Sequence, residues 1–123
     1  MSEVAERGDT PGRKPLRVGV VGVGIMGFNH ARVLSDMPHV ELVGVADPDR
    51  DQAMRVGKAL GCEAVAGHKN LIDLGIEAAV IAAPTHLHHA IAIECIAAGL
   101  HVLVEKPIAP SVEEGRQIVA AAR

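Results

Sequence analysis

The chain has 123 residues, a length that suits one domain with a substantial hydrophobic core. Twelve Lys and Arg against fifteen Asp and Glu give a formal net charge of −3, and the one aromatic residue is Phe28. This composition excludes the basic patch and the aromatic stacking surface of a nucleic-acid-binding protein, and it leaves Val, Ile, Leu and Ala to fill the core.

The chain carries no pattern that is typical of membrane insertion or export. The longest apolar run, 91–100, is ten residues long and contains Glu94, so it cannot span a bilayer. Residues 1–15 are charged and contain Gly and Pro, and we expect a disordered leader there rather than a signal peptide. Cys62 and Cys95 show neither zinc nor redox spacing. We therefore expect a cytoplasmic protein with no membrane partner.

From Leu16 onward, apolar strand patterns alternate with helical patterns through short connections. This alternation predicts an α/β fold, a doubly wound parallel sheet of about five strands in the order 3-2-1-4-5. The predicted strands are 17–21, 40–46, 63–66, 78–83 and 101–105. The predicted helices are 25–37, 50–60, 71–74, 88–98 and a last helix after Ser111. We expect 16–123 to lack the sixth strand of the complete fold.

The sequence also predicts how some of these helices begin, end and are buried. Asp49 is a suitable N-cap for the helix at 50–60, and Gly61 is a suitable terminator. Asn70 is expected to cap the short helix that follows it. The helix 88–98 is apolar nearly all round and is expected to be well buried.

A glycine motif joins the first predicted strand to the first predicted helix. Gly22 allows a tight turn, Gly24 lets backbone N–H groups approach a pyrophosphate, and Gly27 allows close helix packing. The N–H groups of Gly24, Ile25 and Met26 open the helix, where the helix dipole favours negative charge. In this context the motif predicts a Rossmann dinucleotide site, and the alternative is a glycine-rich connection without a ligand.

Asp47 follows the second predicted strand, twenty residues after the last glycine of the motif. Its carboxylate can accept hydrogen bonds from both ribose hydroxyls, and it would repel the 2′-phosphate of NADP. The sequence therefore favours NAD, while Arg50 is near enough to leave NADP open. The alternative for Asp47 is simple turn formation with Pro48.

Three loops are expected to meet where the strand order reverses, beyond the carboxyl ends of the strands. They are the glycine turn 22–27, the loop 84–88 and the loop 105–107. We expect the nicotinamide near Pro84, Thr85, His88 and Lys106, with Glu105 on the opposite face of its strand from Lys106.

A partly desolvated ammonium group at the end of a central strand can exchange a proton with a substrate oxygen, which makes Lys106 the candidate catalytic residue. A solvated lysine at a strand end is the alternative. The neighbouring histidines His86, His88 and His89 do not share a helix face, and we predict no metal site.

Four stretches together resemble the Gfo/Idh/MocA oxidoreductases, the family of glucose-fructose oxidoreductase and inositol dehydrogenase. They are VGVVGVGIMG at 18–27, VADP at 45–48, APTHLHH at 83–89 and AGLHVLVEKP at 98–107. The last two are the more diagnostic. The resemblance covers 16–123 and implies an N-terminal NAD(P)-binding domain, followed in such proteins by an α/β domain with the substrate contacts and the dimer surface.

The resemblance implies hydride transfer between nicotinamide and a hydroxyl carbon of a sugar, nucleotide sugar or cyclitol. It places Lys106 beside the nicotinamide and the substrate hydroxyl, and Thr85 and His88 in the cofactor pocket. The second domain is absent from these residues, so we expect the chain alone to bind cofactor without turnover and to form homo-oligomers only with that domain. One alternative is a non-catalytic NAD(P)-binding module or sensor. Another is a different nicotinamide reductase, which the stretch Glu105-Lys106-Pro107 disfavours.

Overall fold

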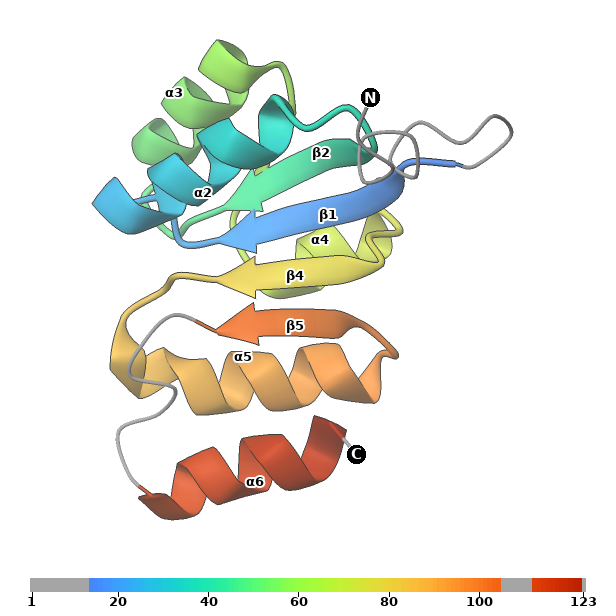
Figure 1. Cartoon of the computed structure of the whole chain (residues 1–123). Helices are drawn as coiled ribbons and strands as arrows, with labels where there is room; N and C mark the ends of the chain where they lie inside the picture. Colours follow the sequence, from blue (N-terminus) through green and yellow to red (C-terminus); the bar gives the residue numbers. More distant parts are fainter. Residues whose placement is uncertain (1–13, 105–111, 123) are drawn as a thin grey trace.

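Five parallel strands form a single sheet in the order β3-β2-β1-β4-β5 (Figure 1), which confirms the predicted strand order. The structure is a computed structural model and describes residues 14–104 and 112–122. The strands are β1 (Leu16–Val21), β2 (Val40–Ala46), β3 (Glu63–Val65), β4 (Ala78–Ile81) and β5 (His101–Val104). The helices are α2 (Ile25–Ser35), α3 (Arg50–Leu60), α4 (His68–Asp73), α5 (Thr85–Ala97) and α6 (Val112–Ala122).

The carboxyl ends of the strands lie level with one another. Val21 at the end of β1 pairs with Ala46 on one side and with Ile81 on the other. Val65 continues this row beyond Ala46, and Val104 continues it beyond Ile81. The loops that leave these strands therefore start from one edge of the sheet, as the predicted site requires.

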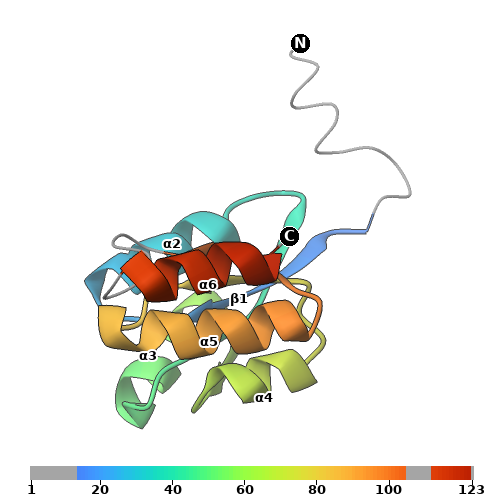
Figure 2. The same ribbon diagram turned by 90° about the horizontal axis from the view of Figure 1, so that it is seen from below.

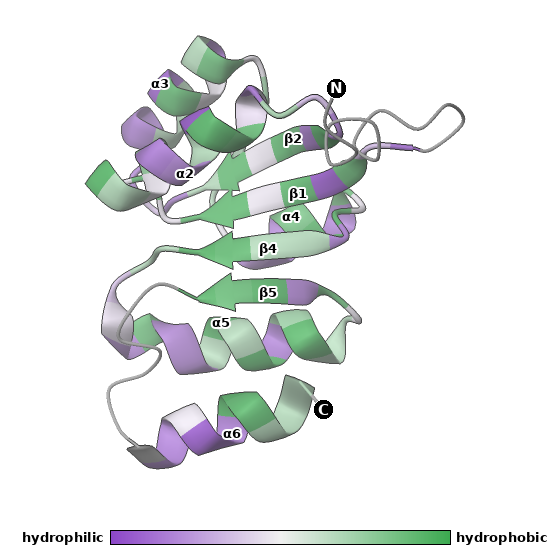
Figure 3. Cartoon of the chain, in the orientation of Figure 1, coloured by the Kyte–Doolittle hydropathy of each residue, from purple (hydrophilic) through white to green (hydrophobic). Residues whose placement is uncertain are grey.

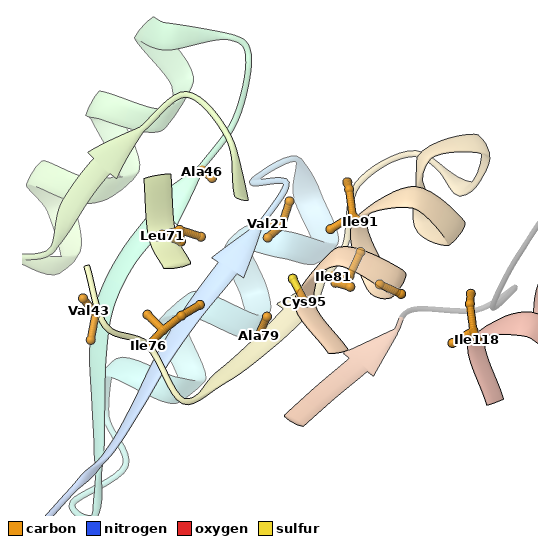
Figure 4. Packing of buried hydrophobic residues seen from close by; sticks show 11 residues of the cluster. Val21, Val43, Ala46, Leu71, Ile76, Ala79, Ile81, Ile91, Cys95 and Ile118 are labelled. Carbon is orange, nitrogen blue, oxygen red and sulfur yellow. The ribbon is translucent and has the colours of Figure 1, made fainter. Parts of the chain in front are cut away.

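The helices cover the two faces of the sheet separately. Helices α2 and α3 pack on one face around Val20, Val45 and Val56. Helices α4 and α5 pack on the other face around Leu71 and Ile81 (Figure 4). Helix α6 lies along α5 and adds Ile118 to the same cluster (Figure 2).

The carboxyl ends of the central strands β1, β2 and β4 are buried and strongly apolar, as expected where a parallel sheet is covered on both faces (Figure 3). The edge strand β5 is less covered, and its Leu103 is 57% exposed. None of the described helices is long and apolar enough to cross a membrane. The predicted leader, residues 1–15, falls mostly outside the described residues, and of it only Lys14 and Pro15 are described.

Helix α5 differs from its prediction at its start and in its burial. It begins at Thr85 rather than His88, because Pro84 precedes the first turn and its carbonyl accepts the N–H of Leu87 at 2.9 Å. One face is buried, and its residues follow helical spacing: His88, Ile91, Ala92 and Cys95. The expected burial is confirmed for this face only, and residues outside it, such as Ala90 and Glu94, are exposed.

Helix α4 corrects a second prediction. It begins at His68 with Gly67 as its N-cap, so Asn70 is the third helical residue and not the cap. The side-chain oxygen of Asn70 instead accepts the N–H of Gly67 at 3.2 Å, which stabilises the helix start from within.

The predictions for α3 are confirmed at both ends. The Asp49 side chain caps its start by accepting the N–H of Gln52 at 3.2 Å. Gly61 ends the helix with φ of 72°, in the left-handed region that favours glycine.

Candidate cofactor-binding site

The glycine turn is built into the junction of three strands. The N–H of Gly22 donates to the carbonyl of Ala46, and the N–H of Ala82 donates to the carbonyl of Val21, both at 2.7 Å. Gly22 has φ of 91°, and a Cβ there would lie 2.6 Å from the backbone nitrogen of Ala83. Only glycine fits at this position, so the predicted tight turn is present and touches the loop after β4.

Gly27 allows helix α2 to start directly on this turn. A Cβ at Gly27 would lie 1.7 Å from the carbonyl oxygen of Gly22, far inside van der Waals contact. Close packing of the helix was the predicted role of Gly27. In the structure, the group that packs closest to it is the Gly22 carbonyl in the turn. The first turn of α2 is thereby held at the carboxyl edge of the sheet.

Gly24 presents an open surface at the start of α2. It is the N-cap residue, it is exposed, and no heavy atom of the described residues lies within 4 Å of the position of a Cβ. Within the described ranges, no backbone carbonyl accepts the N–H groups of Gly24, Ile25 or Met26, and the first bond of the helix runs from Phe28 to Gly24 at 2.8 Å. The first turn contains no acidic residue. Free N–H groups and the positive end of the helix dipole make this surface suitable for an anion.

Two apolar side chains border the open surface. Ile25 is 84% exposed and Met26 is 54% exposed. Such exposure at a helix start next to a turn suits residues that are covered when a ligand or another domain binds.

Asp47 is fixed beside the same turn. Its Oδ2 accepts the N–H of Val23 at 3.0 Å, and its Oδ1 accepts the N–H of Asp49 at 2.9 Å. The carboxylate therefore shapes the turn after β2, as the alternative interpretation required. Each oxygen still has lone-pair capacity for a further donor, because a carboxylate can accept about four hydrogen bonds.

A groove of about 860 Å³ opens next to Asp47. It runs between α3 and β3, and Pro48 and Arg50 line it together with Asp47. Asp47 and Arg50 therefore share an open groove at the end of β2.

His88 holds the loop after β4 from the protein interior. Its side chain is 1% exposed, and Nε2 lies 2.6 Å from the carbonyl oxygen of Ala83. Because a carbonyl only accepts, Nε2 carries the proton and donates it. The histidine thus holds the segment that leads into Pro84 and Thr85, and a direct contact between His88 and a cofactor stays a prediction.

Glu105 and Lys106 lie outside the described residues. The strand that precedes them, β5, ends at Val104 next to Ile81 of β4. The described parts of the predicted site, which are the glycine turn, Asp47 and the start of α5, do lie at one edge of the sheet.

Gln52 was missed by the sequence analysis. Its Nε2 donates to the carbonyl of Val23, inside the glycine turn, at 2.5 Å. The only signal in the sequence was its place three residues after the capping Asp49, and that place is explained by helix capping alone.

The described residues contain neither a cluster of metal ligands nor a thiol with a lowered pKa. Among the described residues, no three His, Cys, Asp or Glu side chains are grouped to hold a metal ion. Burial raises the pKa of Cys95 to about 11, and burial together with the charge of Glu63 raises the pKa of Cys62. Both thiols are therefore protonated at neutral pH and poor nucleophiles.

Comparison with known proteins agrees with this geometry. Residues 16–123 match the Gfo/Idh/MocA model, which is described as an oxidoreductase family with an NAD-binding Rossmann fold. Inositol 2-dehydrogenase 1 of Saccharopolyspora erythraea is 40% identical over an alignment of 110 residues, and the match covers 85% of this chain and 32% of that protein.

Two solved structures with bound dinucleotides are also similar to this chain. GenD2 from gentamicin A biosynthesis, in complex with NAD, is 40% identical with a TM-score of 0.82, covering 89% of this chain and 32% of GenD2. The 3-ketoreductase KijD10 from Actinomadura kijaniata, in complex with TDP-benzene and NADP, is 29% identical with a TM-score of 0.82, covering 89% of this chain and 35% of KijD10.

The chain spans about a third of the length of the relatives that it matches. The family match covers all of the fold described above, including the glycine turn, Asp47 and the start of α5. The chain therefore belongs to the Gfo/Idh/MocA oxidoreductase family with its NAD-binding Rossmann fold.

Proposed function

We propose that residues 16–123 are the cofactor-binding domain of an NAD(P)-dependent dehydrogenase that acts on a hydroxyl carbon of a sugar, nucleotide sugar or cyclitol. The observation that carries this proposal is the open start of α2, where the N–H groups at Gly24, Ile25 and Met26 face no backbone acceptor in the described residues. The relatives named above include an inositol dehydrogenase and a ketoreductase in complex with a nucleotide derivative, which supports the substrate class.

The proposed cofactor runs along the carboxyl edge of the sheet. Its pyrophosphate accepts hydrogen bonds from the N–H groups at Gly24, Ile25 and Met26, and its adenosine ribose donates to Asp47. The nicotinamide then extends toward Pro84 and Thr85, on the β4 side of the glycine turn. The sheet order supports this direction, since Asp47 follows β2 and Pro84 follows β4, on opposite sides of β1 and its glycine turn.

NAD is the proposed cofactor, and NADP is the alternative. The Asp47 carboxylate suits two ribose hydroxyls and opposes a 2′-phosphate at close range. Arg50 lines the groove beside Asp47 and offers a compensating charge. GenD2 is in complex with NAD and KijD10 with NADP, so structures similar to this chain accept either cofactor.

Lys106 is the proposed catalytic residue. Hydride transfer at the nicotinamide ring is chemistry that the cofactor supplies. The Lys106 side chain would accept the proton of the substrate hydroxyl as a neutral amine and return it as an ammonium in the reverse direction, while Glu105 makes a structural or cofactor-side hydrogen bond. Thr85 and His88 would complete the pocket, His88 through the Ala83 carbonyl that it holds.

A substrate domain is proposed as the partner surface for this site. The exposed Ile25 and Met26 would lie under that domain, which would also carry the homo-oligomer interface. We propose a cytoplasmic location.

Replacing Gly24 with alanine separates binding from folding. A Cβ at Gly24 meets no atom of residues 14–104 and 112–122, so Gly24→Ala should keep its melting temperature within a few degrees of wild type. The methyl group would occupy the approach of the pyrophosphate and raise the Kd for NADH about tenfold or more, or ~1.4 kcal/mol. Nicotinamide fluorescence titration and thermal unfolding measure the two effects.

Gly61→Ala is the reverse control. Its φ of 72° strains alanine and lowers the melting temperature, whereas its place at the end of α3 leaves NADH affinity unchanged. Equal NADH affinity for wild type and Gly24→Ala would contradict the pyrophosphate site, and absence of NADH binding by wild type would contradict the proposed function.

Replacing Asp47 with alanine should move cofactor preference toward NADP. The variant loses the repulsion of the 2′-phosphate and the acceptor of the ribose hydroxyls, so the ratio of the Kd for NADPH to that for NADH should fall about tenfold. Asp36→Ala is the control, because Asp36 is an exposed aspartate at the far end of α2 and its loss should leave the ratio unchanged. An unchanged ratio in Asp47→Ala would show that the ribose assignment is wrong.

Lys106→Met tests proton transfer in a version of the chain that carries a substrate domain. Loss of the ammonium group should lower kcat by about a hundredfold or more, while the Kd for NADH changes little. Steady-state turnover of a polyol and sugar panel gives kcat. Near-normal turnover would remove the proton-transfer role, and NADH binding without any wild-type turnover would favour a non-catalytic binding module.

A further inference from the structure

Val23, the residue between the first two motif glycines, is held at both of its backbone groups by side chains of the β2–α3 segment. Its N–H donates to Oδ2 of Asp47 at 3.0 Å, and its carbonyl accepts from Nε2 of Gln52 at 2.5 Å. Its own side chain is 1% exposed in the core. The glycine turn is therefore clamped from outside its own chain segment.

The two clamping residues are themselves joined. Oδ1 of Asp47 accepts the N–H of Asp49 at 2.9 Å, and Oδ1 of Asp49 accepts the N–H of Gln52 at 3.2 Å. Together with the two bonds to Val23, these contacts close a ring. A change in the orientation of the Asp47 carboxylate or of the first turn of α3 would therefore reach the glycine turn.

The bond from Gln52 fixes the peptide plane between Val23 and Gly24. In a trans peptide the carbonyl and the N–H point in opposite directions, so a carbonyl turned toward α3 directs the N–H of Gly24 away from α3. Rotation of this plane changes ψ of Val23 and φ of Gly24, and glycine leaves the second of these angles weakly restricted. No backbone N–H in the described residues donates to the Val23 carbonyl, so Gln52 supplies a restraint that Gly24 does not.

We propose that Gln52 is a positioning residue for the cofactor pyrophosphate, acting through the Val23–Gly24 peptide. It orients the Gly24 N–H before the ligand arrives and so removes part of the ordering cost of binding. The ring also links this donor to Asp47, so that the phosphate and ribose contacts are set together. This inference rests on the proposed function, because it assigns a role within the same site.

Gln52→Met tests the role, because methionine keeps the chain length and helix propensity and lacks the N–H donor. We expect the Kd for NADH to rise about fivefold to twentyfold, which is ~1 to 2 kcal/mol. ADP-ribose, which has the pyrophosphate and no nicotinamide, should lose affinity by the same factor. In ¹⁵N–¹H spectra of the free protein, the amide signals of Val23 and Gly24 should shift or broaden.

Gln117→Met is the matched control. Gln117 also lies in a helix and makes side-chain hydrogen bonds, to His89 and Glu113, in the contact between α5 and α6. Its variant should leave the affinity for both ligands and the Val23 and Gly24 signals unchanged. Gln52→Glu is the second test variant, since a glutamate at this helix position supports the cap while its carboxylate cannot donate.

The outcomes separate the inference from the proposed function. If wild type binds NADH and both Gln52 variants bind within twofold of it, the positioning role is overturned and the cofactor site stands. If the Gln52 variants melt at a lower temperature but bind NADH as wild type does when folded, the hydrogen bond to Val23 is only structural. That result also overturns the positioning role. If wild type binds neither ligand, the proposed function and this inference fall together.

Discussion

The close contact between Gly22 and Gly27 is the constraint on which the rest of the site depends. With 1.7 Å between the Gly22 oxygen and the place of a Gly27 Cβ, helix α2 can start directly on the turn that leaves β1. The same turn touches the backbone of Ala83 after β4. Any side chain at these two glycines would push the start of α2 away from the sheet edge, and the free N–H groups would lose their position over the strand ends.

The glycine turn and the hydrogen-bonded carboxylate of Asp47 meet at Val23. Asp47 both forms the turn after β2 and holds the N–H of Val23, so its structural and its proposed binding roles are compatible rather than exclusive. On the other side of the turn, His88 fixes the Ala83 carbonyl from the interior. The proposed cofactor cleft is thus bordered by loops that buried or bridging polar side chains hold in place, which favours preorganised binding.

The predictable parts of this structure are those that local sterics and periodicity decide. Strand order and the glycine roles followed from the β–α alternation and from the backbone freedom of Gly22 and Gly27. Local prediction failed at Asn70 and at the start of α5, where Gly67 and Pro84 set the helix boundaries. The hydrogen bond from Gln52 to Val23 could not be predicted from the sequence, because it spans 29 residues and depends on how α3 packs against the turn.

A crystal structure of the chain with NAD tests the central claim most directly, since it shows where the pyrophosphate lies. The account predicts phosphate oxygens within hydrogen-bond distance of the N–H groups at Gly24, Ile25 and Met26, with the adenosine ribose on Asp47 and the nicotinamide on the β4 side. A cofactor bound away from the start of α2, or bound in the reverse direction with its nicotinamide at Asp47, would contradict it.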